Sequence, residues 1–223
     1  MRHWLVVALG ASMLAGCAGP DSDIRNRPLA PNPSAFIASE IGFARLAQEK
    51  GQWTAFRETA HPDAVMFVPQ RVRARDWLKS QKDPAEAVKW QPHAVYVSCD
   101  GNSGVTTGAW QKGPANGFFT TVWVRDERGR INWILDHGAD LATPRDAPDF
   151  IASKQAVCGS RPAVPIEAGG EGEDMAVGLA ADQTLSWTST VRADNSRRVT
   201  VRLWDGKAMA TVIDDQVAAP KQP

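Results

Sequence analysis

The feature that most constrains this chain is a two-residue alternation of apolar and polar side chains in its middle. The alternation runs through two pairs of segments, 93–99 with 105–111 and 118–125 with 131–137. The first pair is joined by Asp-Gly-Asn-Ser and the second by Asp-Glu-Arg-Gly, and both sequences are typical of tight turns. Because a period of two places successive side chains on opposite faces of a strand, the sequence predicts two hairpins and at least four antiparallel strands.

Helices are predicted before these strands. Ser34 is a suitable helix N-cap, apolar residues from Phe36 to Ala47 recur on one helical stripe, and Gly51 is a typical stop signal. Helices followed by antiparallel strands predict an α+β domain in which the helices pack on one face of a curved sheet, as in a cone-like barrel. We expect a long helix at 34–50, a short helix around Trp53 and Phe56, a short strand at 64–68 and a short helix at 73–81.

Residues 143–223 follow a different pattern. Segment 146–157 predicts a short helix, and segment 167–173 is a glycine-rich acidic loop. A β-meander is predicted after this loop, and we expect it to pack on the first sheet or extend it. Its three strands are expected at 184–192, 197–204 and 207–214.

The first seventeen residues resemble the signal of a bacterial lipoprotein precursor. Arg2 gives a positive start, and the thirteen residues 4–16 form an apolar stretch that is too short to span a bilayer. The run Leu-Ala-Gly-Cys at 14–17 resembles a lipobox, which implies cleavage before Cys17 and lipidation of that residue. Ala18 then implies, by resemblance to enterobacterial sorting rules, an outer-membrane location facing the periplasm. The alternative is an ordinary secreted protein with a chance cysteine.

Four units are therefore predicted along the chain. The segment after Cys17 carries four prolines among polar neighbours, which is typical of an extended tether between a lipid anchor and a folded domain. The expected units are a signal peptide at 1–16, a lipidated tether at 17–33, a main domain at 34–142 and a C-terminal extension at 143–223.

Charge and motif content exclude several classes of function. Lysine plus arginine equals aspartate plus glutamate at 25 each, so no basic surface for nucleic acid is expected. The chain has no phosphate-cradling glycine loop with lysine and no Gly-x-Ser-x-Gly motif. Its four histidines are scattered, and we expect neither a metal site nor a cofactor.

The cysteines have separate expected fates. Cys17 is assigned to the lipid, which leaves Cys99 and Cys158 as an even pair in an oxidising compartment. A disulfide between them would close a loop of 60 residues. The alternative is two buried free thiols.

The predicted strands resemble a known superfamily. The runs at 104–110, 117–125 and 129–137 look like the terminal strands of nuclear transport factor 2-like domains, which include ketosteroid isomerases and SnoaL-type cyclases. The resemblance covers about 35–142 and is nearest to an uncharacterised secreted branch. It implies a cone-shaped scaffold that hosts both binders and enzymes, so it implies no particular activity. No residue matches the isomerase base or its partners position by position.

Strand parity predicts which side chains line the inside of the cone. The more apolar face of the second hairpin is expected to turn toward the helices. Its members are Phe118, Thr120, Val122, Val124, Ile131, Trp133, Leu135 and His137.

A mostly apolar pocket for a flat ligand is the resulting site hypothesis. The alternative is that the same aromatic side chains simply fill the core. Three residues are weak catalytic candidates: His137 as a general base, and Asp136 and Asp63 as carboxyl groups. The predicted ligand-binding residues are Trp53, Phe67, Trp77, Tyr96, Thr120, Trp133 and His137.

Three functions fit these features. The first is a lipid-anchored periplasmic protein whose domain binds a small apolar ligand or a partner without catalysis. The second is an isomerase, dehydratase or hydrolase that transfers a proton in an apolar cavity. The third is an envelope interaction module that binds a partner or forms a homodimer through its C-terminal strands.

Overall fold

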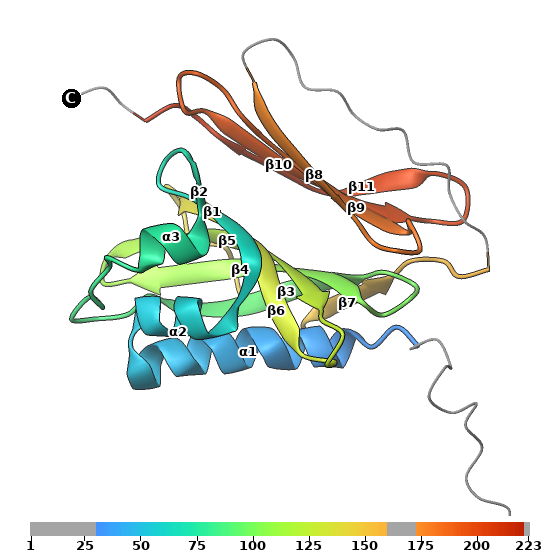
Figure 1. The fold of residues 1–223 in the computed structure, drawn as a ribbon, viewed down its shortest axis with the longest axis horizontal. Helices are drawn as coiled ribbons and strands as arrows, with labels where there is room; N and C mark the ends of the chain where they lie inside the picture. The colour runs from blue at the N-terminus through green and yellow to red at the C-terminus, as the bar shows by residue number, and fades with distance from the viewer. Residues whose placement is uncertain (1–29, 160–172, 221–223) are drawn as a thin grey trace, which may run out of the picture.

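The computed structural model describes residues 30–159 and 173–220, and it has three layers (Figure 1). Three helices form one outer layer, a seven-stranded sheet the middle, and a four-stranded sheet the other outer layer. The α+β class with helices packed on a curved sheet is confirmed. The predicted signal peptide, Cys17, most of the tether and most of the acidic loop lie outside the described residues.

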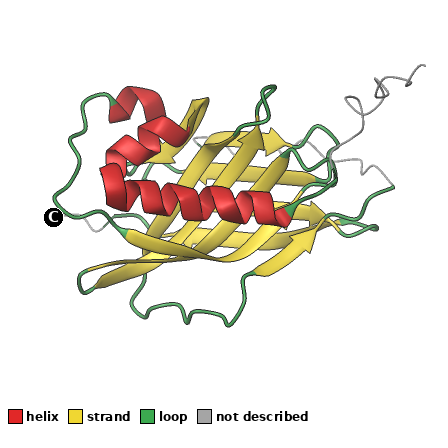
Figure 2. Cartoon of the chain, turned by 90° about the horizontal axis from the view of Figure 1, so that it is seen from below, coloured by secondary structure: helices red, strands yellow, loops and turns green. Residues whose placement is uncertain are grey.

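The helices lie across one face of the seven-stranded sheet (Figure 2). They are α1 (Pro33–Lys50), α2 (Gln52–Thr59) and α3 (Ala74–Leu78). The N-cap of α1 is Asn32 rather than the predicted Ser34, and its side chain accepts a hydrogen bond from the Ala35 amide at 3.3 Å. Gly51 ends α1 and precedes α2 at φ 108°, which is a left-handed conformation that favours glycine. In the described residues, no helix is long and apolar enough to cross a membrane.

The middle sheet has the strand order β2-β1-β6-β5-β4-β3-β7. Both predicted hairpins form within it, as β3 with β4 and β5 with β6. The pairs β1–β6 and β3–β7 are parallel. The strands are β1 (Ala60–Phe67), β2 (Arg71–Arg73), β3 (Lys89–Val97), β4 (Ser103–Lys112), β5 (Ala115–Arg125), β6 (Ile131–Asp140) and β7 (Ala152–Gln155).

The C-terminal sheet is a meander in the order β11-β10-β9-β8. It packs on the middle sheet, which is one of the two predicted arrangements, but it has four strands rather than three. The prediction missed the first of them, and the helix predicted at 146–157 is wrong because β7 lies there and pairs with β3. The strands are β8 (Asp174–Leu179), β9 (Leu185–Val191), β10 (Arg197–Trp204) and β11 (Met209–Val217).

The predicted direction of the faces of β5 and β6 is largely wrong. Arg125 pairs with Ile131 across a loop of five residues, whereas the prediction assumed an even number. The odd loop exchanges the two faces of β6 relative to those of β5. A β-bulge at Ile134 then reverses this exchange, because Trp123 pairs with Trp133 while Val122 pairs with Leu135. One face of the β5–β6 hairpin was expected to meet the helices. Five of its residues face the C-terminal sheet instead, namely Phe118, Thr120, Val122, Leu135 and His137.

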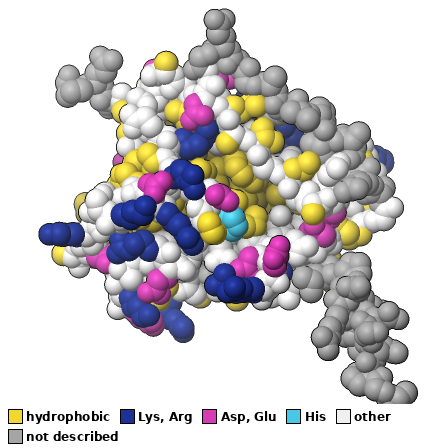
Figure 3. Space-filling view, viewed as in Figure 1, with side chains coloured by type: hydrophobic (Ala, Val, Ile, Leu, Met, Phe, Trp, Pro, Cys, Tyr) yellow, Lys and Arg dark blue, Asp and Glu magenta, His cyan; other side chains and the backbone are white. Residues whose placement is uncertain are grey.

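Two hydrophobic cores therefore lie on opposite sides of the middle sheet. Trp123 and Trp133 pack on the helices with Phe36 and Phe43, whereas Val122 and Leu135 pack on the C-terminal sheet. On the face seen in Figure 3, hydrophobic side chains line a hollow between the two sheets. Because both faces are covered, both are apolar, and apolarity alone did not identify the one that meets the helices.

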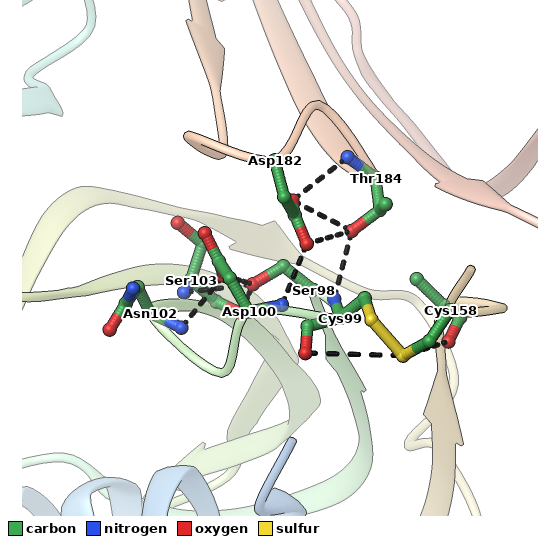
Figure 4. The surroundings of a disulfide bond; sticks show 9 residues. Ser98, Cys99, Asp100, Asn102, Ser103, Cys158, Asp182 and Thr184 are labelled. Atoms are coloured by element: carbon green, nitrogen blue, oxygen red, sulfur yellow. Dashed lines mark hydrogen bonds between the residues drawn. A yellow bond between two sulfur atoms is a disulfide. The ribbon is translucent and has the colours of Figure 1, made fainter. Parts of the chain in front are cut away.

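Polar contacts fix the C-terminal sheet in place. Arg71 at the start of β2 pairs with Asp174 of β8 and donates to the Ser189 carbonyl of β9 at 2.8 Å. Thr120 donates to Asp215 of β11 at 2.7 Å. Figure 4 shows a third attachment, where the Cys99 amide donates to Thr184 Oγ1 at 2.8 Å.

A disulfide joins Cys99 to Cys158 beside this third attachment, as predicted (Figure 4). The two Cα atoms are 5.4 Å apart, a normal separation for a bridged pair. The bridge ties the end of β3 to the segment after β7. It therefore supports the same corner of the molecule as the hydrogen bonds from Cys99 and Asp100 to the turn that precedes β9.

Replacement of both cysteines by alanine is expected to lower the free energy of unfolding by about 4 kcal/mol, because the bridge closes a loop and thereby lowers the conformational entropy of the unfolded chain. Urea denaturation under non-reducing conditions measures this change. The reduced wild-type protein is the matched control and is expected to resemble the double variant. Equal stability of the oxidised, reduced and substituted forms would contradict a stabilising bridge.

Candidate functional site

A pocket lies between the helices and the middle sheet. Its volume is about 440 Å³, within the usual range for small-molecule sites. Most of its wall is aromatic or aliphatic, and the wall comes from α1, α2, β1 and β3 to β6. The lining residues are Phe43, Gln52, Trp53, Phe56, Met66, Phe67, Val88, Trp90, Trp110, Phe119, Asp136, His137, Gly138, Ala139 and Asp140.

Glycines in the sheet make room for aromatic rings in this pocket. Trp110 pairs with Gly117, and a Cβ added at Gly117 would overlap the Trp110 indole. Phe119 pairs with Gly108, and a Cβ there would meet the Phe119 ring at 2.8 Å. The two rings therefore lie low over the neighbouring strands. This packing leaves open space above the floor formed by β4, β5 and β6.

Asp136 is a half-buried polar residue of the pocket floor. The bulge at Ile134 turns its side chain toward the helices, opposite Thr121, whose hydroxyl donates to Asp136 Oδ2 at 3.0 Å. Burial and the nearby charge of Glu40 raise the pKa of Asp136 to about 8. The carboxyl is therefore mostly protonated at neutral pH and ionises slightly above it.

Glu40 is a second carboxyl group behind the pocket wall. It is wholly buried on α1. The Trp90 indole donates to its Oε1 at 2.6 Å, and the Thr106 hydroxyl donates to its Oε2 at 2.5 Å. The Trp123 indole in turn donates to Thr106 Oγ1 at 2.8 Å. Burial raises the pKa of Glu40, and these donors act against that rise by stabilising the carboxylate.

Three of the seven predicted ligand-binding residues line the pocket, namely Trp53, Phe67 and His137. The other four lie outside its lining. Trp77 packs edge-on against Trp53 at 5.2 Å between ring centroids, and Trp133 is wholly buried against Phe56. Tyr96 and Thr120 lie on the side of the C-terminal sheet.

His137 differs from its predicted role as the pocket's ionisable group. Its ring lies between Phe67 and Phe118, and its Nδ1 accepts a hydrogen bond from Arg197 Nε at 3.2 Å. Burial, together with the Arg197 charge, lowers the pKa of His137 to about 3. A histidine with so low a pKa holds a proton too weakly to be an efficient general base near neutral pH.

The two predicted carboxyl groups, Asp63 and Asp136, lie in different places. Asp63 is exposed, and its carboxylate oxygens lie 3.9 Å from His61 Nδ1 and 3.5 Å from Arg73 Nη2. Asp136 was assigned to the less apolar face of β6, and the structure places that face inside the cone. The prediction missed Glu40, although a charged residue four positions after Phe36 and three before Phe43 on an apolar helical stripe is a readable signal of a buried carboxyl.

In the described parts of the chain, no group of three or more histidine, cysteine or acidic side chains is placed to hold a metal ion. The candidate site is an aromatic pocket with Asp136 at its floor and Glu40 behind its wall.

Comparison with known proteins adds the following findings. No family model and no curated protein matches the chain. Solved structures do match, each over about half of this chain with a TM-score of 0.40. They include a candidate ketosteroid isomerase from Parabacteroides distasonis (18% identity, 52% of this chain and 98% of that one), a cystatin-like fold protein from Burkholderia xenovorans (14%, 50% and 92%) and a protein of unknown function from Pectobacterium atrosepticum (10%, 49% and 91%).

The names of these structures include a ketosteroid isomerase and a cystatin-like fold protein. Similarity this low does not allow an activity to be inferred for this protein. The fold class follows from the element order and the layers, and the function has to be inferred from the pocket itself.

The contribution of Asp136 to the free energy of unfolding is expected to fall as the pH rises from about 4 to 8. Over this range the folded protein keeps a proton on Asp136 that the unfolded chain, with an ordinary carboxyl pKa near 3.8, has released. The asparagine side chain of Asp136→Asn is neutral at every pH, so wild type is expected to lose stability relative to this variant as the pH rises. Urea denaturation at pH 5, 7 and 9 measures the difference. Asp63→Asn, at an exposed carboxyl, is the control, and an equal pH slope in wild type and Asp136→Asn would contradict the assignment.

Proposed function

We propose that this protein binds a small, largely apolar ligand in the aromatic pocket, with Asp136 as the polar contact at its floor. The observation that carries the proposal is a cavity of about 440 Å³ with a mainly aromatic wall, in which the half-buried carboxyl group of Asp136 is held by a hydrogen bond from Thr121. Apolar walls supply affinity through burial of ligand surface, while a single polar group fixes orientation.

The rings of the wall come from different parts of the chain and are held by contacts with one another. Phe43 of α1 packs edge-on against Phe56 of α2 at 4.7 Å and against Trp90 of β3 at 4.9 Å. Trp53 packs against Phe56 at 5.4 Å. Side chains fixed in this way lose little freedom when a ligand binds, which favours affinity.

Proton transfer is the second candidate function. It is favoured by the two carboxyl groups, because Glu40 lies in a network of hydrogen-bond donors while Asp136 meets the pocket with a pKa of about 8. A group with such a pKa both gives and takes protons near neutral pH. Catalysis would be added to binding at the same place, so both functions share the pocket.

The proposed location is the bacterial cell envelope, with the mature protein anchored through lipid on Cys17 and facing the periplasm. The lipobox-like run at 14–17 supports the anchor. The disulfide between Cys99 and Cys158 supports an oxidising compartment, since such bridges are rare in the reducing cytosol. Homodimer or partner binding through the C-terminal sheet stays a prediction.

Native mass spectrometry of the chain without residues 1–17, which leaves every described residue in place, is expected to detect a retained small molecule or a bound neutral aromatic probe such as 2-naphthol. Trp53→Ala removes part of the pocket wall and is expected to weaken probe binding about tenfold, as measured by probe fluorescence. Trp204→Ala, at a part-buried tryptophan of β10, is the matched control. Equal loss in both variants, or no binding at all, would contradict the pocket as the site.

A further inference from the structure

The charged side chains among the described lining residues of the pocket are carboxyl groups. The carboxyl groups of Asp136 and Asp140 line it, and no lysine or arginine is among its described lining residues. Glu40 of α1 adds a third carboxyl group behind the wall and interacts electrostatically with Asp136. Arg197 binds His137 and the Gly138 carbonyl from the opposite side of the sheet, and its guanidinium group lies over the Phe67 ring at 5.4 Å. On the helix side, therefore, the described lining offers carboxyl groups and no basic side chain to a ligand.

Two carboxyl groups that share an apolar site resist ionising together. In a low-dielectric environment each negative charge disfavours the other, and the empty pocket responds by holding a proton. A positively charged ligand would neutralise the same repulsion, because it would stand beside Asp136 where the carboxyl borders the cavity. The positive charge of the ligand and the proton on Asp136 would then compete for the same carboxylate.

The remaining wall is also suited to a cation. The rings of Phe43, Trp53, Phe56, Trp110 and Phe119 border the cavity. The negative faces of such rings attract ammonium groups, and tryptophan attracts them most strongly. Aromatic cages with a nearby carboxylate are a recurrent way to bind quaternary ammonium compounds.

We propose that the ligand of this pocket is an organic cation, a tertiary or quaternary ammonium compound with an apolar body. This inference rests on the proposed function, because it names the class of ligand for the same pocket. The ammonium group lies next to the Asp136 carboxylate and the apolar body fills the space between the rings. Binding therefore displaces the proton from Asp136 into solvent.

The rival is a neutral ligand whose oxygen accepts a hydrogen bond from protonated Asp136. The two ligand classes respond to pH in opposite directions. Affinity for a cation increases as Asp136 ionises, whereas affinity for a neutral acceptor decreases over the same range. Asp140 lines the pocket and Glu40 lies behind its wall, and a negative charge on either residue favours a cation as a charge on Asp136 does.

The test compares benzyltrimethylammonium with its uncharged isostere, neopentylbenzene, which has the same shape. Binding to the chain without residues 1–17 is followed by tryptophan fluorescence at pH 6, 7 and 9. We expect the cation to bind at least about tenfold more tightly than the isostere at pH 9, with a smaller advantage at pH 6. Calorimetry at pH 7 in buffers of different ionisation enthalpy is expected to show release of close to one proton per bound cation.

Variants separate the charge from the shape of the site. Asp136→Asn is expected to abolish proton release and most of the preference for the cation while keeping the affinity for the isostere. Asp63→Asn, at an exposed carboxyl, is the matched control and is expected to behave like wild type. If Asp136→Asn does not fold, the pH dependence and proton release of the wild-type protein decide the question alone.

Each outcome has a distinct meaning. Equal affinity for both compounds, or tighter binding of the isostere, would overturn the cation proposal while supporting an apolar binding pocket. Failure of both compounds to bind would overturn the pocket function itself. Preference for the cation that survives unchanged in Asp136→Asn, with no proton release, would place the cation elsewhere and overturn the assignment to this pocket.

Discussion

The unpaired residue Ile134 in β6 determines which side chains of that strand face the helices. Without the bulge, Leu135 and His137 would follow Trp133 into the helix-side core, and Asp136 would face the C-terminal sheet. With it, Asp136 enters the cone and His137 lies against Arg197. The pocket's chemistry therefore depends on one local departure from regular strand pairing, a common device near functional sites.

Burial of acidic groups is the second constraint on the site. Glu40 is tolerated in the core because Trp90 and Thr106 satisfy both of its oxygens. Asp136 has one donor, Thr121, and borders open space rather than packed side chains. The better-satisfied carboxyl is part of the scaffold, and the less-satisfied one is available to a ligand. This difference in hydrogen bonding is the reason why the proposed ligand contact is Asp136 and not Glu40.

Much of the first domain could be predicted from the sequence, because its signals are local. Gly51, the turn sequences after Cys99 and Arg125, and the two-residue alternation led to the helices and hairpins observed. Strand β8 and strand β7 were missed, because short, exposed strands have weak patterns and form only where a partner strand is available. Glu40 was missed although its position on the apolar stripe of α1 marks it as buried.

The sequence by itself determined the α+β class, the hairpins, the pairing of Cys99 with Cys158 as one of two alternatives, and Trp53 and Phe67 as pocket residues. Tertiary structure alone decided that the C-terminal sheet covers the second face of the middle sheet. It also decided, through a five-residue loop and one bulge, that the side chain of Asp136 rather than that of His137 turns toward the helices. The physical reason is that parity is set by exact pairing between strands, and a shift of one residue leaves composition unchanged while it exchanges the two faces.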